Sequence, residues 1–526
     1  MLRRSRPEYS RGPQLPRALT GRSASSRSIG LLAALLLSSL APTRPALAAA
    51  GERAAAAVSG PRSVLPFIED DFARAQKQAR DSGRLLVIDA WAPWCHTCLS
   101  MRNLVFPDPQ LAPMAERFVY LAVDTELPQN AGFVERFPIR SLPTILVLDG
   151  QEQIVARYTG AMTAPELLAR LQDLLRRQSA SGASVAAILQ KADAAALAAD
   201  PTAAAALYDQ AARAAQAESG ARSAAQRARA RLGQIQALRE AGQYRACAEL
   251  ADLAHQEVGR DATATDFFSF GADCTGRVTE VDVQQRLRRQ LRSHLEALVR
   301  DPQAPLLPDD RSDGYGTLVE LAEALTDAAA AERYTVERLA VLETAAAQAK
   351  NPVAAATYDA HRLECYRRLK RYAPAEAMLL ASQRAMPRDY NPPARLARLY
   401  LDMGRLDEGR AAIERALSLA QGPRRVSMYE LRANLLHALG RTQDAIDSLE
   451  AAIRLVTPKP GAPETLVRSA QGRIAQLRKS QDALRQALPP PTAPTTAPPG
   501  SPASDASPAT KKTSKAARLA KRGGPK

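Results

Sequence analysis

The pattern of hydrophobic and polar residues changes character near residue 180. Upstream, residues 85–88 form a continuous apolar run, which predicts a strand buried on both faces. Residues 99–106 then have helical spacing, and residues 145–148 form a second apolar run. From 183 to 486 strand-like patterns almost disappear, and alanine, leucine and arginine recur at helical intervals. The pattern therefore predicts an α/β domain followed by an all-α one.

The helical half contains internal repeats. Similar 16-residue segments begin at Lys370, Gly404 and Gly440, which are 34 and 36 residues apart, and a fourth begins at Gly242. Small residues occupy one aligned position, where two helices can approach closely: Cys247, Ala375, Gly409 and Ala445. The segments resemble the tetratricopeptide repeat, a helix pair that stacks into a solenoid because one pair cannot bury its apolar face alone. The repeat pattern is weak between residues 260 and 350.

Length and charge narrow the classes of function. The chain has 526 residues, of which 46% are hydrophobic and 24% charged, proportions that are typical of a folded protein of several domains. Its net charge of +16 is concentrated at the ends, because residues 1–48 carry +7 and residues 489–526 carry +6. The intervening chain is nearly neutral, so the folded domains are not expected to bind nucleic acid.

Both ends differ from the folded part. Residues 1–48 contain an arginine-rich segment, an apolar run at 29–40 and a small-residue cleavage site at 46–48, which is the order of a secretory signal peptide. This predicts an exported, periplasmic protein. An uncleaved membrane anchor is the alternative, although a bilayer requires about 20 apolar residues. Residues 489–526 are rich in proline and then lysine, which predicts a disordered tail that either aids solubility or adheres to an anionic surface.

The candidate chemistry lies in a CHTC motif at residues 95–98, between the first predicted strand and a helix. A thiolate at a helix start is stabilised by the helix dipole and by unpaired N–H groups, which lower its pKa below about 8.5. Cys95 would attack a disulfide, and Cys98, one turn further on, would resolve the mixed disulfide. The alternatives are half of a zinc site or a structural disulfide. No second CxxC or histidine cluster accompanies the motif in the sequence, so no metal site is expected.

The segment VIDAWAPWCHTC resembles the active-site strand and turn of the thioredoxin superfamily. An acid and a tryptophan stand at the corresponding positions, as Asp89 and Trp94. Residues 140–144 (RSLPT) are similar to the loop that contains the family's cis-proline, which would be Pro143. The resemblance implies a thioredoxin-like domain over residues 63–178, followed by the tetratricopeptide-like helices over 183–486.

Residues 103–126 assign this resemblance to one branch of the superfamily. They are similar to the branch that includes the C-terminal domain of DsbD-type membrane reductases, in which an acid, here Asp124, ends the next strand. Two positions depart from thioredoxin itself. The dipeptide between the cysteines is His-Thr rather than Gly-Pro, and Tyr120 stands where thioredoxin has a buried lysine. Both positions bear on the reduction potential rather than on the type of reaction.

The resemblance and the local chemistry assign roles to several residues. Asp89, near the end of a buried strand, is expected to have a raised pKa and to accept the Cys98 proton; a solvated turn acid is the alternative. His96 either stabilises the Cys95 thiolate or is merely exposed at the helix start. No cofactor is expected beyond the redox-active disulfide. The substrate groove would be lined by Trp94, His96, Leu142 and Pro143.

Three further cysteines lie in the helical half. Cys247 and Cys274 either pair across neighbouring helices, as an oxidising compartment would allow, or are small buried hydrophobic residues. Cys365 would then remain unpaired. The four histidines other than His96 are widely separated in the sequence and are expected to be single surface or packing residues.

These features predict an exported thiol–disulfide oxidoreductase that acts on protein thiols and disulfides. We expect a reductase, supplied by a membrane electron donor, whose repeats bind a protein or peptide partner; alternatively the repeats only space or dimerise the redox domain. Two other functions stay open. One is an interaction scaffold with an accessory redox domain, and the other is a disulfide-donating oxidase, which a thiolate stabilised by His96 would favour.

Overall fold

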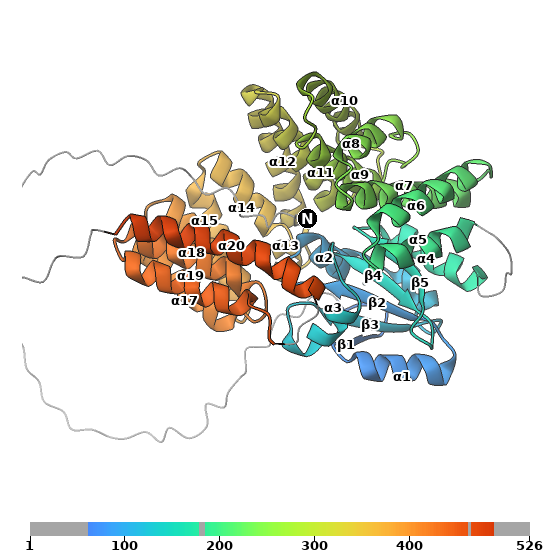
Figure 1. Ribbon diagram of the computed structural model, residues 1–526, viewed down its shortest axis with the longest axis horizontal. Helices are drawn as coiled ribbons and strands as arrows, with labels where there is room; N and C mark the ends of the chain where they lie inside the picture. Colours follow the sequence, from blue (N-terminus) through green and yellow to red (C-terminus); the bar gives the residue numbers. More distant parts are fainter. Residues whose placement is uncertain (1–61, 178–184, 461–463, 489–526) are drawn as a thin grey trace, which may run out of the picture.

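The described residues comprise an α/β region and a long succession of helices (Figure 1). The computed structural model describes residues 62–177, 185–460 and 464–488. The predicted signal peptide at 1–48 and the predicted tail at 489–526 lie outside these ranges. Within them, no helix is both long and apolar enough to cross a bilayer.

Five strands form one mixed sheet in the order β1-β3-β2-β4-β5. The strands are β1 (Phe67–Glu69), β2 (Leu86–Trp91), β3 (Val119–Asp124), β4 (Thr144–Leu148) and β5 (Ile154–Thr159). The first three run parallel, whereas β4 is antiparallel to both β2 and β5. Because β2 is central, Asp89 lies between Ala122 of β3 and Ile145 of β4. This mixed sheet confirms the predicted α/β, thioredoxin-like fold class.

Alternate strand residues form two separate cores. Ile88 and Leu121 pack on the face covered by α1 and α3, whereas Val87 and Tyr120 pack on the face covered by η1 and α4. The helices and short turns of this domain are α1 (Phe72–Ser82), α2 (His96–Ser100), η1 (Met101–Val105), η2 (Pro109–Met114), η3 (Pro128–Asn130), α3 (Ala131–Arg136) and α4 (Ala164–Arg177). The continuous apolar run of β2 is thus explained by burial on both faces.

The second half is entirely helical in its described residues. Its helices are α5 (Val185–Leu197), α6 (Pro201–Gln216), α7 (Ala221–Glu240), α8 (Tyr244–Leu253), α9 (Ala262–Thr275), α10 (Val281–Val299), α11 (Pro308–Ala324), α12 (Ala328–Gln348), α13 (Pro352–Ala356), α14 (Asp359–Arg368), α15 (Tyr372–Ala385), α16 (Asn391–Asp402), α17 (Leu406–Leu419), α18 (Arg425–Ala438), α19 (Thr442–Val456) and α20 (Glu464–Gln486). This architecture confirms the predicted tetratricopeptide-like solenoid.

The small residues of the repeats mark close approaches between helices. Ala375, Gly409 and Ala445 are buried at equivalent places in α15, α17 and α19. A Cβ atom on Gly409 would lie 2.6 Å from the Leu435 side chain, so α17 and α18 require a glycine at this contact. The weakly patterned stretch 260–350 also forms long helices. Its buried polar side chains interrupt the apolar periodicity that the repeats show elsewhere.

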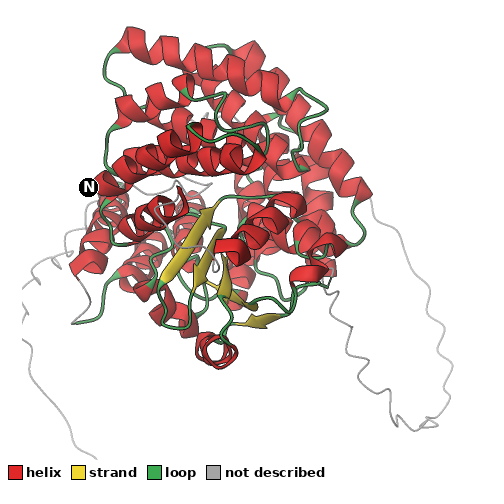
Figure 2. Ribbon diagram, turned by 90° about the vertical axis from the view of Figure 1, so that its right-hand side faces the viewer, coloured by secondary structure: helices red, strands yellow, loops and turns green. Residues whose placement is uncertain are grey.

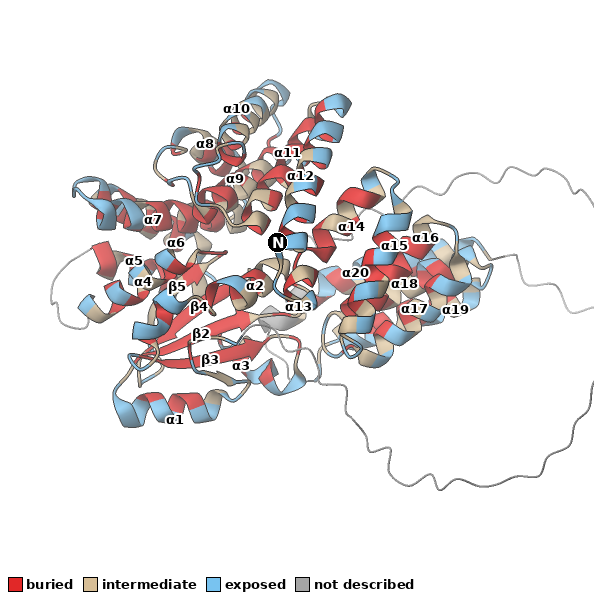
Figure 3. Cartoon of the chain, turned by 180° about the vertical axis from the view of Figure 1, so that it is seen from behind, coloured by how far each residue is buried: buried red, intermediate tan, exposed pale blue. Residues whose placement is uncertain are grey.

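The solenoid curves around the α/β domain instead of extending away from it (Figure 2). Its first helix packs beside the sheet edge, where the Arg157 backbone N–H of β5 donates to Asp193 of α5 over 2.9 Å. Asn103, in η1 directly after α2, donates a 2.9 Å hydrogen bond to Thr357 of the solenoid. In Figure 3 the α11–α14 and α16–α18 regions lie beside the end of the sheet that carries α2. The solenoid therefore contributes residues to the surroundings of the CHTC motif.

Candidate functional site

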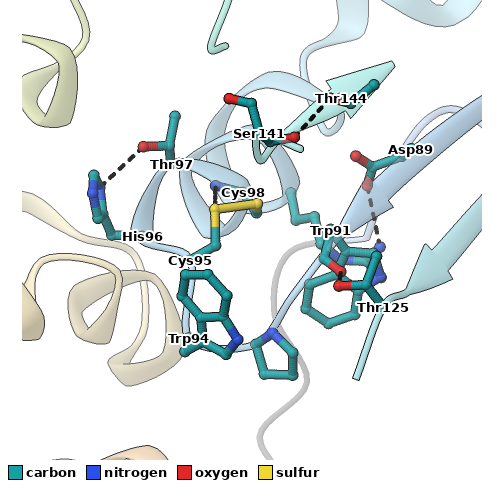
Figure 4. The surroundings of a disulfide bond; sticks show 12 residues. Asp89, Trp91, Trp94, Cys95, His96, Thr97, Cys98, Thr125, Ser141 and Thr144 are labelled. Carbon is teal, nitrogen blue, oxygen red and sulfur yellow. Dashed lines mark hydrogen bonds and ion pairs between the residues drawn. A yellow bond between two sulfur atoms is a disulfide. The ribbon is translucent and has the colours of Figure 1, made fainter. Parts of the chain in front are cut away.

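Cys95 and Cys98 form a disulfide where β2 leads into α2 (Figure 4). Cys95 caps the helix, since its Sγ accepts a 3.1 Å hydrogen bond from the Cys98 backbone N–H. Cys95 is 6% exposed, and Cys98 is fully buried. An N–H group is thus directed at the sulfur that would carry the negative charge after reduction.

The opposite side of the motif is formed by the loop before β4. The Leu142–Pro143 peptide bond is cis, and Leu142 packs against the cluster of Ala92, Cys95 and Cys98. The Pro143 carbonyl accepts a 3.0 Å hydrogen bond from the Gly160 N–H, which anchors the loop to the end of β5. Leu142 and Trp94 both contact the disulfide cluster, as a groove around the motif requires.

Asp89 is buried behind the disulfide, on the side opposite His96 (Figure 4). Burial raises its pKa to about 7, although the Arg102 guanidinium, 3.6 Å from Oδ2, acts in the opposite direction. Neither carboxylate oxygen accepts a hydrogen bond from a described residue. Arg102 is held in turn by the Trp91 ring, 4.1 Å below its guanidinium carbon. Asp89 can therefore exchange a proton near neutral pH.

Trp94 connects the active-site loop to the solenoid. Its Nε1–H donates to Glu126 over 2.9 Å, and the other Glu126 oxygen accepts the Arg424 backbone N–H over 2.7 Å. The Arg424 guanidinium also lies 4.8 Å from the Trp94 ring. Next to it, Asn391 donates to the Pro93 carbonyl over 3.1 Å. These contacts hold the loop that precedes Cys95 against the starts of α16 and α18.

Asp124 and Tyr120 support the site without facing the disulfide cluster. Asp124 accepts the Glu126 backbone N–H over 2.9 Å and thereby orients the loop that carries Glu126. Burial raises the pKa of Asp124 to about 6. The buried Tyr120 hydroxyl donates to the Met114 carbonyl over 2.9 Å, which ties β3 to the preceding turn.

His96 faces the solenoid. Its Nδ1 lies 3.4 Å from Asp309 Oδ2 and its Nε2 lies 3.6 Å from Asp313 Oδ1, both near the start of α11. The His361 ring of α14 lies against it, with ring centroids 3.7 Å apart. Nδ1 also lies 3.1 Å from the Thr97 hydroxyl, so His96 is not merely exposed at the helix start. Its role as a stabiliser of the Cys95 thiolate stays a prediction.

The expectation that the other histidines are single residues is wrong for His255, His294 and His361. His361 pairs with His96, and His255 stacks on His294 with ring centroids 3.9 Å apart. Stacked helices bring together residues that are far apart in the chain, so separation in the sequence carried no information about these pairs.

The remaining cysteines lie in the solenoid. Cys247 of α8 and Cys274 of α9 form a disulfide, and Cys365 of α14 is an unpaired buried thiol. Burial raises the pKa of Cys365 to about 11, so this thiol is far less reactive than an exposed one.

Several residues around the motif had no signal in the local sequence. Asp309, His361, Asn391 and Arg424 reach the site through the docking of the solenoid, whereas Glu126 lies in the loop after β3. Each contact joins segments that are remote along the chain, and helical periodicity does not predict which solenoid residues will meet α2.

The sheet, the cis-proline and the CHTC motif define a thioredoxin-like domain, and the comparisons with known families agree. The thioredoxin-like domain family matches residues 72–175. The tetratricopeptide repeat family matches residues 395–463. The chain thus contains a thioredoxin-like domain and tetratricopeptide repeats.

The relatives of the first domain are thiol:disulfide interchange proteins. DsbD of Pseudoalteromonas atlantica is 33% identical over 121 residues, which cover 22% of this chain and 20% of that protein. DsbD of Haemophilus ducreyi is 32% identical over 103 residues, or 19% of this chain and 18% of that protein. The match therefore spans only about a fifth of these relatives.

Among solved structures, a tetratricopeptide repeat protein from Parabacteroides merdae is similar to the helical half. It is 15% identical, and the match covers 56% of this chain and 100% of that chain with a TM-score of 0.36. So low a score does not by itself define the fold, which rests on the sheet order, the helix succession and the family matches.

Proposed function

We propose that the protein is an exported thiol–disulfide oxidoreductase that reduces disulfides in protein substrates. One observation carries this proposal: a cysteine pair at a helix start lies beside a cis-proline, with a buried carboxyl group behind it. The relatedness of the domain to thiol:disulfide interchange proteins supports the same reaction type. The electrons are carried by the cysteine pair, so the exchange requires no other cofactor.

In the first step the Cys95 thiolate attacks one sulfur of a substrate disulfide. A bond forms between Cys95 Sγ and that sulfur, the substrate S–S bond breaks, and the second substrate sulfur leaves as a thiolate. The Cys98 N–H, 3.1 Å from Cys95 Sγ, stabilises the attacking thiolate. Pro143 and Leu142, beside the motif, would position the substrate backbone.

In the second step Cys98 resolves the mixed disulfide. Asp89, as carboxylate, accepts the Cys98 thiol proton, and the resulting thiolate attacks Cys95 Sγ. The Cys95–Cys98 disulfide forms, the first substrate sulfur leaves as a thiolate, and two electrons have passed to the substrate. A pKa of about 7 suits Asp89 to this role, because the group can both take up and release a proton near neutral pH. An external electron donor must then reduce the pair again.

The solenoid would select the substrate at the site itself. A cavity of about 380 Å³ between α16, α18 and α20 is lined by Asn391 and Arg424, the two residues that also contact the active-site loop. A peptide bound there would reach the Trp94 loop directly. This location favours partner binding over a solenoid that merely spaces the redox domain.

The surroundings of His96 support a reductase rather than an oxidase. An oxidase would be favoured if His96 stabilised the Cys95 thiolate, but its ring nitrogens face Asp309 and Asp313. Export rests on the signal-like segment at residues 1–48. A membrane protein would supply the electrons outside the cytosol.

Two measurements test the proposal. Purified protein should reduce insulin disulfides when coupled to a dithiol, and Cys95→Ser should abolish this turnover. Alkylation trapping in intact cells should find the Cys95–Cys98 pair mostly reduced, and oxidised after loss of the membrane donor. A fully oxidised pair in healthy cells, with a potential near the roughly −120 mV of strong oxidases, would instead make the protein a disulfide donor.

One observation favours the scaffold alternative: Cys95 is almost covered by the loop and the docked solenoid. If turnover is absent and partners co-purify equally with wild type and Cys95→Ser, the redox domain is accessory and the solenoid carries the function.

A further inference from the structure

Three side chains from three helices bring potential metal ligands together beside the active-site helix. They are His96 of α2, Asp313 of α11 and His361 of α14, and their ligand atoms all lie within 4.8 Å of one another. We propose that these residues bind a divalent metal ion of the zinc class at the contact between the thioredoxin-like domain and the solenoid. The site does not depend on the proposed redox activity, so either proposal can fail without the other.

Two of the three ligand–ligand separations are close to those of a tetrahedral site. The Nε2 atoms of His96 and His361 lie 3.6 and 3.5 Å from the same oxygen, Asp313 Oδ1. Both separations are too long for good hydrogen bonds. Zinc–nitrogen and zinc–oxygen bonds of about 2.0–2.1 Å place neighbouring tetrahedral ligands roughly 3.4 Å apart. The two separations on Asp313 Oδ1 therefore match those expected around a bound metal ion.

The second nitrogen of each histidine faces an oxygen. His96 Nδ1 lies 3.1 Å from the Thr97 hydroxyl and 3.4 Å from Asp309, and His361 Nδ1 lies 2.8 Å from the Ser312 hydroxyl. Ser312 is oriented by the Arg338 Nε–H, which donates to its hydroxyl over 2.9 Å. If each Nδ1 carries the proton, both Nε2 lone pairs point to the shared Asp313 oxygen. Metal-binding histidines are usually held in this way, with a carboxylate or hydroxyl on the nitrogen that does not bind the metal.

A cation would also balance the buried carboxylates around the three ligands. Asp309 is 1% exposed, and neither of its oxygens accepts a hydrogen bond from a described residue. Asp310 is buried as well, and its carboxylate accepts the Leu307 backbone N–H over 3.0 Å. Burying several acids together is costly without a compensating charge. A divalent ion would supply that charge.

The second histidine pair lacks these features and serves as a control. His255 and His294 stack with an interplanar angle of 12°, and His294 Nε2 lies 3.0 Å from Asp252 Oδ1, within hydrogen-bonding distance. The His255 Nδ1 is 2.6 Å from the Asp252 carbonyl oxygen. Here hydrogen bonds to one residue account for the pair, so no metal is required.

The donor set indicates the class of ion. Two imidazoles and one carboxylate suit zinc and related transition ions, whereas calcium and magnesium prefer sites built from oxygen ligands alone. Three protein ligands leave a fourth position for a water molecule or another ligand. Asp313 is 29% exposed at its side chain, which provides an entry path from solvent. Bound metal would fix the start of α2 against the solenoid.

The test is a Zn²⁺ titration of the tag-free full chain by calorimetry and metal analysis. Both disulfides stay oxidised, so that no thiolate competes for the ion. We expect one Zn²⁺ per chain, with affinity reduced at least about 100-fold by His361→Gln and by Asp313→Asn, and about 10- to 100-fold by Ser312→Ala. His294→Gln should bind as tightly as wild type.

A cobalt spectrum and a melting curve separate binding at this site from other effects. Co²⁺ should give a tetrahedral visible spectrum without thiolate-to-metal charge transfer, and Asp313→Asn should abolish it. Zn²⁺ should raise the melting temperature of wild type and His294→Gln but not of Asp313→Asn. Because Asp313 is partly exposed, Asp313→Asn should fold even if His361→Gln does not. Binding that is absent in wild type, or unchanged in Asp313→Asn, would overturn the proposal.

Discussion

The two disulfides of the described chain are both buried, yet their surroundings differ. Cys95–Cys98 closes a single helical turn beside the cis-proline, with Asp89 behind it and an N–H group on Cys95 Sγ. Cys247–Cys274 spans 27 residues and joins α8 to α9 within the main apolar core of the solenoid. The first pair lies beside an N–H group and a buried carboxyl group, whereas the second has apolar neighbours.

Under the proposed function, the environment rather than burial alone separates a reactive disulfide from a structural one. A short loop removes little entropy from the unfolded chain, so the first disulfide adds little stability and can be opened at low cost. The longer loop of the second disulfide removes more entropy, which makes that disulfide a stabilising crosslink. The predictions below test this division of roles.

The largest expected effect is on turnover. Cys95→Ser should reduce insulin-disulfide reduction to the uncatalysed rate, because no other described thiol lies at a helix start beside the cis-proline. The double variant Cys247→Ser/Cys274→Ser should retain turnover at a temperature where it is folded. Loss of activity in the double variant with its fold intact would break the comparison.

Cys98→Ala should leave an attacking thiolate without a resolving one. Mixed disulfides with substrate proteins should then accumulate through Cys95 and be visible on non-reducing gels. The control is the same variant with Cys95→Ser added. Equal accumulation in that control would show that the assigned roles are wrong.

Removal of the solenoid disulfide should lower stability. For a 27-residue loop the loss in the free energy of unfolding is about 3.5 kcal/mol, whereas the loop between Cys95 and Cys98 corresponds to less than about 2 kcal/mol. Urea unfolding of Cys247→Ser/Cys274→Ser and of Cys95→Ser/Cys98→Ser measures the two losses in the free energy of unfolding. Equal losses would contradict the division into a structural and a reactive pair.

Asp89→Asn should slow exchange by about 100-fold near neutral pH, since the Cys98 proton loses its acceptor. The variant should also lose the inflection near pH 7 in its pH–rate profile. An unchanged profile would remove the proton-transfer role from Asp89.

The same substitution has a stability effect of known sign. The folded chain binds the Asp89 proton up to about pH 7 and the unfolded chain only up to about pH 4, so stability falls as pH rises between these values. A difference of about three pH units corresponds to roughly 4 kcal/mol. The side chain in Asp89→Asn does not ionise. The variant should therefore be more stable than wild type at pH 8 and as stable as wild type at pH 4. Urea unfolding at both values measures this.

The smallest expected effect concerns access to Cys95. Arg424→Ala removes a cation–π contact with Trp94 worth about 0.5–1 kcal/mol, so maleimide labelling of reduced Cys95 should speed up by roughly 2- to 5-fold. Arg425→Ala is the matched control, because that guanidinium lies over Tyr429. Equal rates in both variants would show that the solenoid does not restrict the site.

Local sequence patterns anticipated most of the fold. The apolar run of β2 and the repeats from Lys370 onward have periodicities that burial imposes on any chain, so they predicted a buried strand and stacked helices. The stretch 260–350 showed the pattern weakly, because polar residues such as Asp309 and Arg338 are buried there. Their burial depends on partners in other helices and has no local signature.

The sequence by itself determined the chemistry of the thioredoxin-like domain. Asp89 and the CHTC motif lie within residues 89–98, and the family resemblance added Pro143, which precedes the strand that pairs with β2. Only the tertiary structure decided what surrounds that chemistry. His96 meets Asp313 and His361 because a curved solenoid returns to α2. The angles between successive stacked helices add up along the solenoid. No local sequence pattern therefore determines where its distant helices will lie.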